Sequence, residues 1–467
     1  MTILPRELYP LHPYQLLAIE WMKFRKEGYL NIDMGLGKTR IVLDYIRLTH
    51  KPESSGAVLI VAPMRVATST WPAQIREWTP ELSYAVLHGH DKEENFKLKR
   101  DLYIINYEGL KWLDEMVTKY GRSKFFHGVL VLDEATMVKS SSSGRFKYLK
   151  SLRSSFDKAF ALSATPAPNG YQDLWSQYFL LDYGKTLGHQ YTRFFNRYFQ
   201  TTESRRVVPV STERLKEIPK LCAKSTFRLS ADDYLKLPEF TNNDLYVDLP
   251  PKLLAQYKEL EKDFLLKLSE ETSVTAMNAA VLSMKLRQFC QGGIYNASEE
   301  NSRELVDIHR LKVDMLEQII QELQGAPTLV AIQFRYEVDF IRERFPNAPA
   351  IYGGISAKES DRLINLWNAG KLPMLICHPA SLSHGVNLQA GGHYITWLAL
   401  TWNFEQYTQF NGRLRRQGQK NRVVLNRVLV RGSIEEKMAK RLSQKETTQQ
   451  ELLDVLRDMT NEILAQS

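Results

Sequence analysis

Two glycines, a lysine and a threonine stand close together near the start of the chain, where the sequence is DMGLGKT. Glycines allow backbone N–H groups to surround phosphate oxygens, a lysine supplies positive charge, and a threonine hydroxyl can bind Mg²⁺. Gly35, Gly37, Lys38 and Thr39 are therefore candidates for a phosphate loop between a strand and a helix. The first glycine of the general GxxxxGK[ST] pattern is missing, because Ile32 stands at its position. The alternative is a glycine turn that only caps a helix.

Two carboxylates end the apolar run VLVLDEAT, residues 129–136. Carboxylates at the end of a buried strand are costly unless they face a site. Asp133 is placed to hold Mg²⁺, and Glu134 is placed to orient and deprotonate an attacking water. Together with a phosphate loop upstream, this pair predicts hydrolysis of ATP.

Three arginines lie within four residues of the segment QFNGRLRRQGQ, residues 409–419. One interpretation is a basic patch that faces solvent or binds nucleic acid. The other is a catalytic helix, because Arg413 and Arg416 are three residues apart and would share a helix face, with Gln409 on that face or beside it. A guanidinium there would stabilise charge on a transferring phosphoryl group. Arg415 would lie off that face, in solvent or against a phosphate.

Composition describes a soluble globular protein of 467 residues, with 43% hydrophobic and 25% charged residues. The chain has no run of eighteen apolar residues and no signal-peptide pattern, so we expect an intracellular, cytoplasmic protein that does not span a membrane. Its three cysteines lie far apart, which argues for a reducing compartment. The net charge of +9 favours a polyanionic partner.

Short apolar runs bounded by turn signals recur in the first and last thirds of the chain. Apolar runs without alternation are typical of strands buried on both faces, in a parallel sheet covered by helices. The pattern predicts an α/β protein with two lobes. The runs are residues 56–63, 101–107, 128–135, 158–166, 327–334, 373–379, 393–400 and 422–430.

The middle of the chain has a different pattern. Residues 171–222 are aromatic-rich and polar without a strand run, and from Pro250 apolar residues follow three-and-four spacing, so both segments predict helices. Ser433, with Glu436 three residues later, predicts a capped C-terminal helix. The expected domains are lobe 1 at 1–225 with a helical insertion from about 171, lobe 2 at 226–432 with an insertion at about 250–300, and a helical extension at 433–467.

The motifs, taken in order, resemble those of the Swi/Snf group of superfamily-two helicase-like ATPases. The resemblance covers nearly the whole chain; the phosphate loop and the final arginine motif are specific, and the order of the others adds weight. It implies two RecA-like lobes with ATP hydrolysed at the cleft between them. The other matching segments are LHPYQLLAIEWM, APMRVATSTW, INYEGL, LDEATMVKS, LSATPAPNGYQDLW, FRLSADDYLKLPEF, MKLRQFCQGG, SHGVNLQAGG and WNFEQYTQFNGRLRRQGQ.

The resemblance also implies roles for single residues. Gln15 would read the adenine, and Ser163, Thr165 and Gln409 would couple hydrolysis to DNA. Thr136 stands where the family usually has histidine, which leaves the gating of hydrolysis open, and Ile32 replaces an acidic residue. Five more positions either meet the DNA backbone, or link it to the ATP site, or only pack and face solvent: Arg65, Lys139, Ser381, Thr401 and Trp402.

Three functions remain open. The first is an ATP-dependent translocase on double-stranded DNA that binds without sequence preference, in a minimal bacterial or phage-type form that acts as a monomer. The second is a strand-separating DNA or RNA helicase, although no strand-splitting hairpin is visible in the sequence. The third is an ATP-dependent nucleic-acid clamp with little turnover, against which Glu134, Arg413 and Arg416 argue. The direction of movement, the preferred DNA structure and the protein partners are not predicted.

Overall fold

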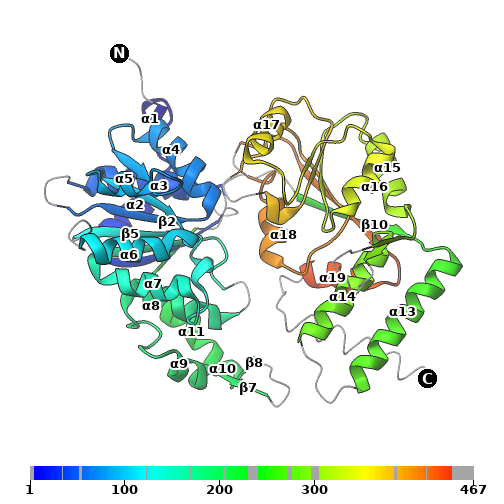
Figure 1. The fold of residues 1–467 in the computed structure, drawn as a ribbon, viewed down its shortest axis with the longest axis horizontal. Helices are drawn as coiled ribbons and strands as arrows, with labels where there is room; N and C mark the ends of the chain where they lie inside the picture. Colours follow the sequence, from blue (N-terminus) through cyan, green and yellow to red (C-terminus); the bar gives the residue numbers. More distant parts are fainter. Residues whose placement is uncertain are drawn as a thin grey trace. The chain divides into compact units, whose positions relative to one another are not determined.

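The chain forms two compact units, divided between Lys236 and Leu237, and each contains its own parallel sheet (Figure 1). The computed structural model describes residues 5–33, 35–51, 55–121, 125, 127–167, 170–202, 207–229, 240–270, 276–295, 304–382, 386–416 and 418–443. Within these residues, no helix combines the length and the apolarity that crossing a membrane requires.

Seven parallel strands form the sheet of the first unit, in the order β3-β4-β2-β5-β6-β1-β9. Strands β2 and β4 are buried along their whole length, which requires cover on both faces of the sheet and explains their unbroken apolar sequence. The strands are β1 (Glu27–Ile32), β2 (Val58–Ala62), β3 (Tyr84–Val86), β4 (Leu102–Asn106), β5 (Gly128–Asp133), β6 (Phe156–Ser163) and β9 (Thr226–Leu229).

Helices connect the strands of the first unit and form its insertion. Those before β6 are α1 (Pro5–Leu8), α2 (Pro13–Lys23), α3 (Lys38–Thr49), α4 (Trp71–Trp78), α5 (Lys92–Lys97), α6 (Leu110–Tyr120) and α7 (Gly144–Leu152). The insertion after β6 contains α8 (Leu174–Asp182), α9 (Tyr191–Tyr198), α10 (Thr212–Leu215) and α11 (Glu217–Ala223).

The order of strands places three motifs side by side. Strand β6 pairs with β1 on one side and with β5 on the other, and all three run parallel. The carboxyl ends of parallel strands lie at one edge of a sheet, where ligands of open α/β sheets bind. The phosphate loop follows β1, the carboxylates end β5, and Ser163 ends β6, so the fold brings these motifs to neighbouring positions on one edge.

The sheet of the second unit has six parallel strands, in the order β10-β17-β16-β13-β15-β14. Alternate residues of β13 enter different apolar clusters: Leu329 and Ala331 face one, and Val330 faces the other. Both faces of this sheet are therefore covered. The strands are β10 (Phe240–Val247), β13 (Thr328–Ala331), β14 (Ala350–Ile351), β15 (Met374–Cys377), β16 (Tyr394–Trp397) and β17 (Val423–Val430).

The second unit also has an insertion, formed by the helices α13 (Pro251–Glu270) and α14 (Ala276–Cys290), and a strand pair, β11 (Gly293–Tyr295) with β12 (Leu305–Asp307). Its last helix, α19, follows directly after β17. The remaining helices are α15 (Leu311–Glu322), α16 (Tyr336–Arg344), α17 (Ala357–Asn368), α18 (Phe404–Asn411) and α19 (Ile434–Ser443).

The predicted fold class is confirmed, since every apolar run named above contains a strand of one of the two parallel sheets. Strands β3 and β14 are too short to leave a pattern, and β10 alternates in burial because it is an edge strand. The segment 171–222, interpreted as free of strands, contains the hairpin β7 (Phe199–Thr201) and β8 (Val207–Pro209).

Two expected domain boundaries need comment. Strand β9 was expected in the second lobe, but it pairs with β1 and extends the sheet of the first unit. The boundary at residue 225 is therefore placed too early. Helix α19 belongs to the second unit, and the rest of the predicted C-terminal extension, residues 444–467, lies outside the described residues, as do residues 230–239 of the segment expected to join the lobes.

Candidate active site

The predicted phosphate loop joins β1 to α3. Gly35 and Gly37 have φ angles of 83° and 77°, in the left-handed region that favours glycine. Lys38 begins α3, and its Nζ donates to the carbonyl of Ile32 at 2.7 Å. Ile32 is the last residue of β1 and contributes its main-chain oxygen, so this loop does not need the missing glycine at that position.

Gln15, predicted to read the adenine, contacts the phosphate loop directly. Its Nε2 donates to the carbonyl of Leu36 at 3.2 Å, and its Oε1 accepts from the backbone N–H of His12 at 2.9 Å. A Cβ at Gly37 would lie 2.4 Å from Gln15 Nε2. Close packing against Gln15 therefore requires a glycine at position 37 in addition to the backbone conformation, whereas adenine recognition stays a prediction.

The predicted carboxylates lie at the end of β5. Asp133 Oδ2 accepts from Trp71 Nε1 at 2.9 Å, and the Asp133 carbonyl accepts from the Tyr107 hydroxyl at 2.8 Å. Glu134 has a φ angle of 53°, a conformation that side-chain-bearing residues rarely adopt and that is found at functional sites. Sequence reasoning missed Trp71 and Tyr107 as supports of Asp133, although both lie in or beside motif segments.

These residues fit a nucleoside triphosphate with Mg²⁺. The loop glycines precede the N-terminus of α3, where backbone N–H groups and the helix dipole attract an anion. Mg²⁺ is usually held by one or two protein oxygens together with substrate phosphates, and Thr39 and Asp133 are the candidates here. When bound, Mg²⁺ would neutralise charge on the phosphate oxygens. The described residues contain no group of three or more His, Cys, Asp and Glu side chains that could hold a metal without a substrate.

The predicted coupling residues follow β6. Ser163 is fully buried, and its Oγ accepts from the backbone N–H of Thr165 at 3.1 Å. Ser163 pairs with Asn31 of β1, and the preceding Leu162 pairs with Asp133 of β5. The coupling segment thus lies between the strand that enters the phosphate loop and the strand that ends in the carboxylates.

The predicted DNA-contacting residues of the first unit lie at the same edge of the sheet. Arg65 follows β2 and precedes a π-helical turn, Val66–Thr70, and Lys139 ends the 3₁₀ turn that follows β5. Both side chains are half-buried. Thr136, at the position of the family's histidine, is buried within that turn, and its carbonyl accepts from the backbone N–H of Lys139 at 3.2 Å.

The arginine motif of the second unit lies after a helix rather than on one. Helix α18 ends at Asn411 with Gly412 as its cap, so the prediction that the arginines share a helix face is wrong. Gly412 ends the helix because glycine has low helix propensity. Arg413 and Arg416 nevertheless converge, since Nη1 of each donates to the carbonyl of Val386, at 3.1 and 3.4 Å.

The three arginines differ in their surroundings. Arg413 is 5% exposed, and burial lowers the pKa of Arg416 to about 10, which still leaves it charged at neutral pH. The guanidinium of Arg415 lies 5.3 Å from the centroid of the Phe240 ring, as in a cation–π contact. Gln409, predicted as a coupling residue, lies on α18 and donates through Nε2 to Glu405 Oε1 at 3.0 Å.

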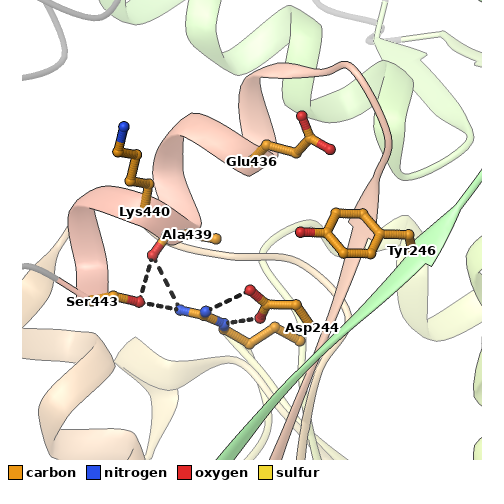
Figure 2. Close-up of a pocket in the computed structure, with 7 residues that line it drawn as sticks. Asp244, Tyr246, Glu436, Ala439, Lys440 and Ser443 are labelled. Atoms are coloured by element: carbon orange, nitrogen blue, oxygen red, sulfur yellow. Dashed lines mark hydrogen bonds and ion pairs between the residues drawn. The ribbon is translucent and has the colours of Figure 1, made fainter.

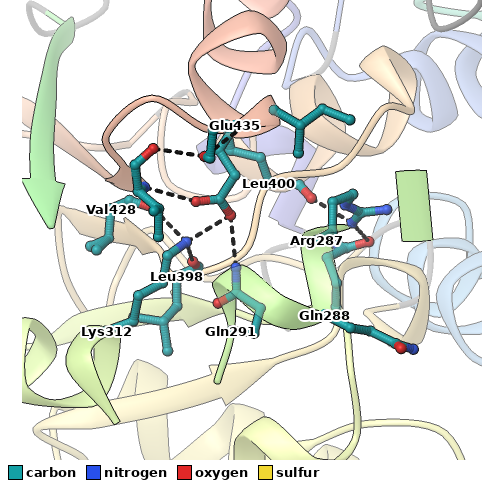
Figure 3. A network of polar contacts seen from close by, with 12 residues as sticks. Arg287, Gln288, Gln291, Lys312, Leu398, Leu400, Val428 and Glu435 are labelled. Carbon is teal, nitrogen blue, oxygen red and sulfur yellow. Dashed lines mark hydrogen bonds and ion pairs between the residues drawn. The ribbon is translucent and has the colours of Figure 1, made fainter. Parts of the chain in front are cut away.

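A buried ion pair stabilises the centre of the second unit (Figure 3). Lys312 is 2% exposed and Glu435 1% exposed, and their charged atoms are 2.7 Å apart. Lys312 Nζ also donates to the carbonyls of Leu398 and Val428, at 2.7 and 2.8 Å. Gln291 Nε2 donates to Glu435 at 2.7 Å. Because burying two charges is costly, such a pair serves to specify one arrangement of α14, α15, α19 and the ends of β16 and β17.

The same network holds the segment that contains Thr401 and Trp402, two predicted DNA contacts. Arg287 Nη2 donates to the carbonyl of Leu400 at 2.6 Å, as Figure 3 shows, and Trp402 Nε1 donates to Ser283 Oγ at 2.7 Å. Both partners belong to α14. Thr401 is buried, and its Oγ1 accepts from the backbone N–H of Asn403.

Ser381, the remaining predicted DNA contact, ends a short 3₁₀ turn after β15 and is half-buried. Its backbone N–H donates to the carbonyl of His378 at 2.9 Å. Ser381, Thr401 and Trp402 therefore all follow the carboxyl ends of strands of the second sheet. Their contact with DNA stays a prediction.

A pocket of about 580 Å³ lies elsewhere in the second unit, among β10, β17 and α19 (Figure 2). Arg427 binds both oxygens of Asp244, at 2.6 and 2.8 Å, and its Nη1 donates to the Ala439 carbonyl and to Ser443 Oγ, each at 3.1 Å. These contacts join α19 to the sheet. The lining residues include none of the predicted site residues, and Asp244 neutralises Arg427, so we assign the pocket a structural role.

Comparison with known proteins identifies the family. The SNF2-related domain matches residues 14–293, and the helicase conserved C-terminal domain matches residues 311–418. The chain belongs to the SNF2-related family of helicase-like ATPases. The predicted family is thereby confirmed, and the two matched regions cover both sets of motifs described above.

Relatives of this SNF2-related chain include phage and bacterial proteins. It is 30% identical over 466 residues to putative protein p41 of Acyrthosiphon pisum secondary endosymbiont phage 1, covering 95% of this chain and 98% of the relative. It is 27% identical over 473 residues to the putative ATP-dependent helicase/translocase YwqA of Bacillus subtilis, covering 95% of this chain and 49% of the relative. The chain thus spans nearly all of the phage relative and about half of the bacterial one.

Among solved structures, the SWI2/SNF2 ATPase core of Sulfolobus solfataricus, solved in complex with dsDNA, matches with a TM-score of 0.44 and 23% identity. The match covers 93% of this chain and 91% of that chain. The family assignment above rests on the two domain matches.

Proposed function

We propose that this SNF2-related chain is an ATP-dependent translocase that moves on double-stranded DNA without sequence preference. The observation that carries the proposal is the meeting of three motifs at one edge of the first sheet. The phosphate loop, the Asp133–Glu134 pair and the Ser163–Thr165 segment follow three neighbouring parallel strands. A nucleotide, a catalytic base and a coupling segment are thereby adjacent.

The proposed catalytic roles follow from the side-chain chemistry. Backbone N–H groups of the glycine loop and Lys38 bind the phosphates, and Thr39 and Asp133 bind Mg²⁺. Glu134 takes the proton of the attacking water. Arg413 and Arg416 stabilise charge on the transferring phosphoryl group, where the planar, permanently charged guanidinium is more suitable than an ammonium. Gln15 contributes recognition of the adenine.

Binding to DNA is proposed to occur through its phosphate backbone. The net charge of +9 supports a polyanionic partner, and backbone contacts give affinity without sequence preference. The proposed contacts are Arg65, Lys139, Ser381, Thr401 and Trp402. All five follow the carboxyl ends of strands of their own sheet or belong to the turns that begin there.

The rate of ATP hydrolysis, measured without nucleic acid and with single-stranded DNA, duplex DNA or RNA, tests the proposal. We expect duplex DNA to raise the rate most and its affinity to fall steeply with salt, because bound phosphates release counterions. Maximal stimulation by single-stranded DNA or RNA would favour a strand-separating helicase. A slow rate with every nucleic acid would favour a clamp.

Movement without unwinding is tested by two assays run side by side. We expect ATP-dependent displacement of the third strand from a triplex, because a translocase on duplex DNA meets it as an obstacle. We expect no opening of a forked duplex in the same conditions. Fork opening without triplex displacement would contradict the proposal and support the strand-separating helicase.

Replacing Lys38 by Ala tests the phosphate loop. We expect ATP hydrolysis to be abolished while the melting temperature falls little, because the loss in the free protein is one half-buried hydrogen bond to Ile32, worth about 0.5–1.5 kcal/mol. Nucleotide binding, hydrolysis and thermal melting are measured on the same preparation. Lys158→Ala, which removes a lysine that donates to Tyr45 away from the loop, is the matched control. A large loss of stability without ligand would show that Lys38 is chiefly structural.

A further inference from the structure

Helix α8 is connected by polar side chains to three motif segments of the first unit. Ser176 Oγ donates to the carbonyl of Lys139 at 2.6 Å. Gln177 Nε2 donates to the carbonyl of Pro166 at 2.8 Å, and Gln177 Oε1 accepts from the Tyr29 hydroxyl at 2.7 Å. Lys139 follows β5, Pro166 follows β6, and Tyr29 lies in β1. Two successive residues of one helix therefore contact the three neighbouring strands, or their loops, that form the proposed ATP site.

The Tyr29–Gln177 contact is fully buried. Both residues are 0% exposed, and Gln177 Nε2 also donates to the carbonyl of Asp173 at 2.8 Å. Burial, with a further contribution from the neighbouring Tyr178 and from the negative charge of Glu134, raises the pKa of Tyr29 well above its usual value. Tyr29 therefore stays a neutral hydroxyl that donates to Gln177, close to the proposed catalytic base.

The contacts give α8 a route between a proposed DNA contact and the coupling segment. Lys139 is a proposed contact with the DNA backbone, and its carbonyl is bound to Ser176. The next residue, Gln177, binds the end of the Ser163–Pro166 segment and the strand that enters the phosphate loop. Because a helix turn moves as one body, a displacement of the loop at Lys139 would be transmitted through Ser176 and Gln177 to Pro166.

We propose that Tyr29 and Gln177 are positioning residues that hold the Ser163–Pro166 segment in the arrangement through which duplex DNA stimulates ATP hydrolysis. The inference rests on the proposed function, since it takes Glu134 as the base and Ser163 and Thr165 as coupling residues. Tyr29 and Gln177 touch neither nucleotide nor DNA in this proposal. Their effect is on the ratio of stimulated to unstimulated rates.

A neighbouring tyrosine provides a matched control. Tyr178 follows Gln177 on α8, is also buried, and its ring stacks on that of Tyr29 with centroids 5.4 Å apart. Its hydroxyl makes a hydrogen bond of 2.6 Å with Thr226 Oγ1, in β9, rather than with a motif segment. Tyr178→Phe and Tyr29→Phe therefore each remove one buried hydroxyl from the same aromatic pair, and only Tyr29→Phe disturbs the proposed connection.

The test compares the full chain with Tyr29→Phe, Gln177→Leu, the double variant and Tyr178→Phe. ATP hydrolysis with and without saturating duplex DNA is measured beside the melting temperature. We expect Gln177→Leu to lower the stimulation ratio by about ten-fold, within the usual range of coupling effects. Tyr29→Phe lowers the ratio less, because Gln177 still binds Pro166. Tyr178→Phe leaves the ratio at the wild-type value.

The double variant separates positioning from stability. Removing both partners leaves no buried polar group of this pair unpaired, so its melting temperature recovers relative to Gln177→Leu. The stimulation ratio does not recover, because the Pro166 carbonyl has still lost its donor. Recovery of both quantities, or a wild-type ratio in Gln177→Leu, would overturn the inference while wild-type stimulation upholds the proposed function. A wild-type chain that duplex DNA does not stimulate would overturn both.

Discussion

Arg416→Ala lowers kcat for ATP hydrolysis at saturating duplex DNA by about 10³–10⁵-fold, or roughly 4–7 kcal/mol of transition-state stabilisation. The reason is the loss of a guanidinium that, in the proposed mechanism, opposes the charge developing on the phosphoryl group. DNA binding without nucleotide changes little, because this arginine is largely buried and donates to the carbonyl of Val386. Steady-state hydrolysis, DNA binding and thermal melting measured on one preparation check the result.

The neighbouring arginines supply the controls. Arg415→Ala keeps nearly normal hydrolysis, since its guanidinium lies against Phe240. Arg416→Lys does not restore activity, because an ammonium lacks the planar fork. Arg413→Ala loses both activity and stability, because Arg413 is buried and donates to Val386 as well. Similar, salt-suppressible losses of DNA binding at all three positions, with normal hydrolysis, would instead identify a basic patch.

Glu134→Gln gives a protein that binds Mg·ATP normally and hydrolyses it slower by about 10²–10⁴-fold, the usual contribution of a general base. The amide has the shape of the carboxylate but cannot accept the proton of the attacking water. The phosphate loop and Asp133 are unchanged, so nucleotide affinity is retained. Nucleotide binding at equilibrium and single-turnover hydrolysis measure the two effects separately.

A second carboxylate of the first unit is the control for this substitution. Glu108→Gln removes a partly exposed carboxylate, 2.7 Å from Arg145, that lies outside the proposed machinery. We expect near-normal hydrolysis for this variant. If Glu134→Gln also turned over ATP at a near-normal rate, the catalytic base would have to be another residue.

Local features of the chain were open to prediction because their physical causes lie in adjacent residues. The phosphate loop depends on consecutive glycines that adopt positive φ and on the lysine that follows them, so Gly35, Gly37 and Lys38 identify it without knowledge of the fold. Strands buried on both faces have to be apolar throughout, so runs such as that of β2 predict a parallel sheet directly.

Patterns weakened where a structural element is short, polar or at an edge. Strand β14 has two residues, and β10 is an edge strand that alternates in burial, so neither leaves the apolar run of a central strand. Strand β9 was expected with the second lobe, because nothing in its four residues indicates that the partner is β1. The choice of partner depends on where the chain returns after the helical insertion.

The sequence by itself determined the family, the two sheets and the residues of the phosphate loop, because residue type and spacing carry that information. The tertiary structure decided which distant groups meet. The Val386 carbonyl receives Arg413 and Arg416 beyond the end of α18, although helical spacing placed them on a helix. Tyr29 finds Gln177 across 148 positions, and Lys312 finds Glu435 across 123. A buried hydrogen bond between such residues depends on how the elements pack, and no local pattern of residue types records that packing.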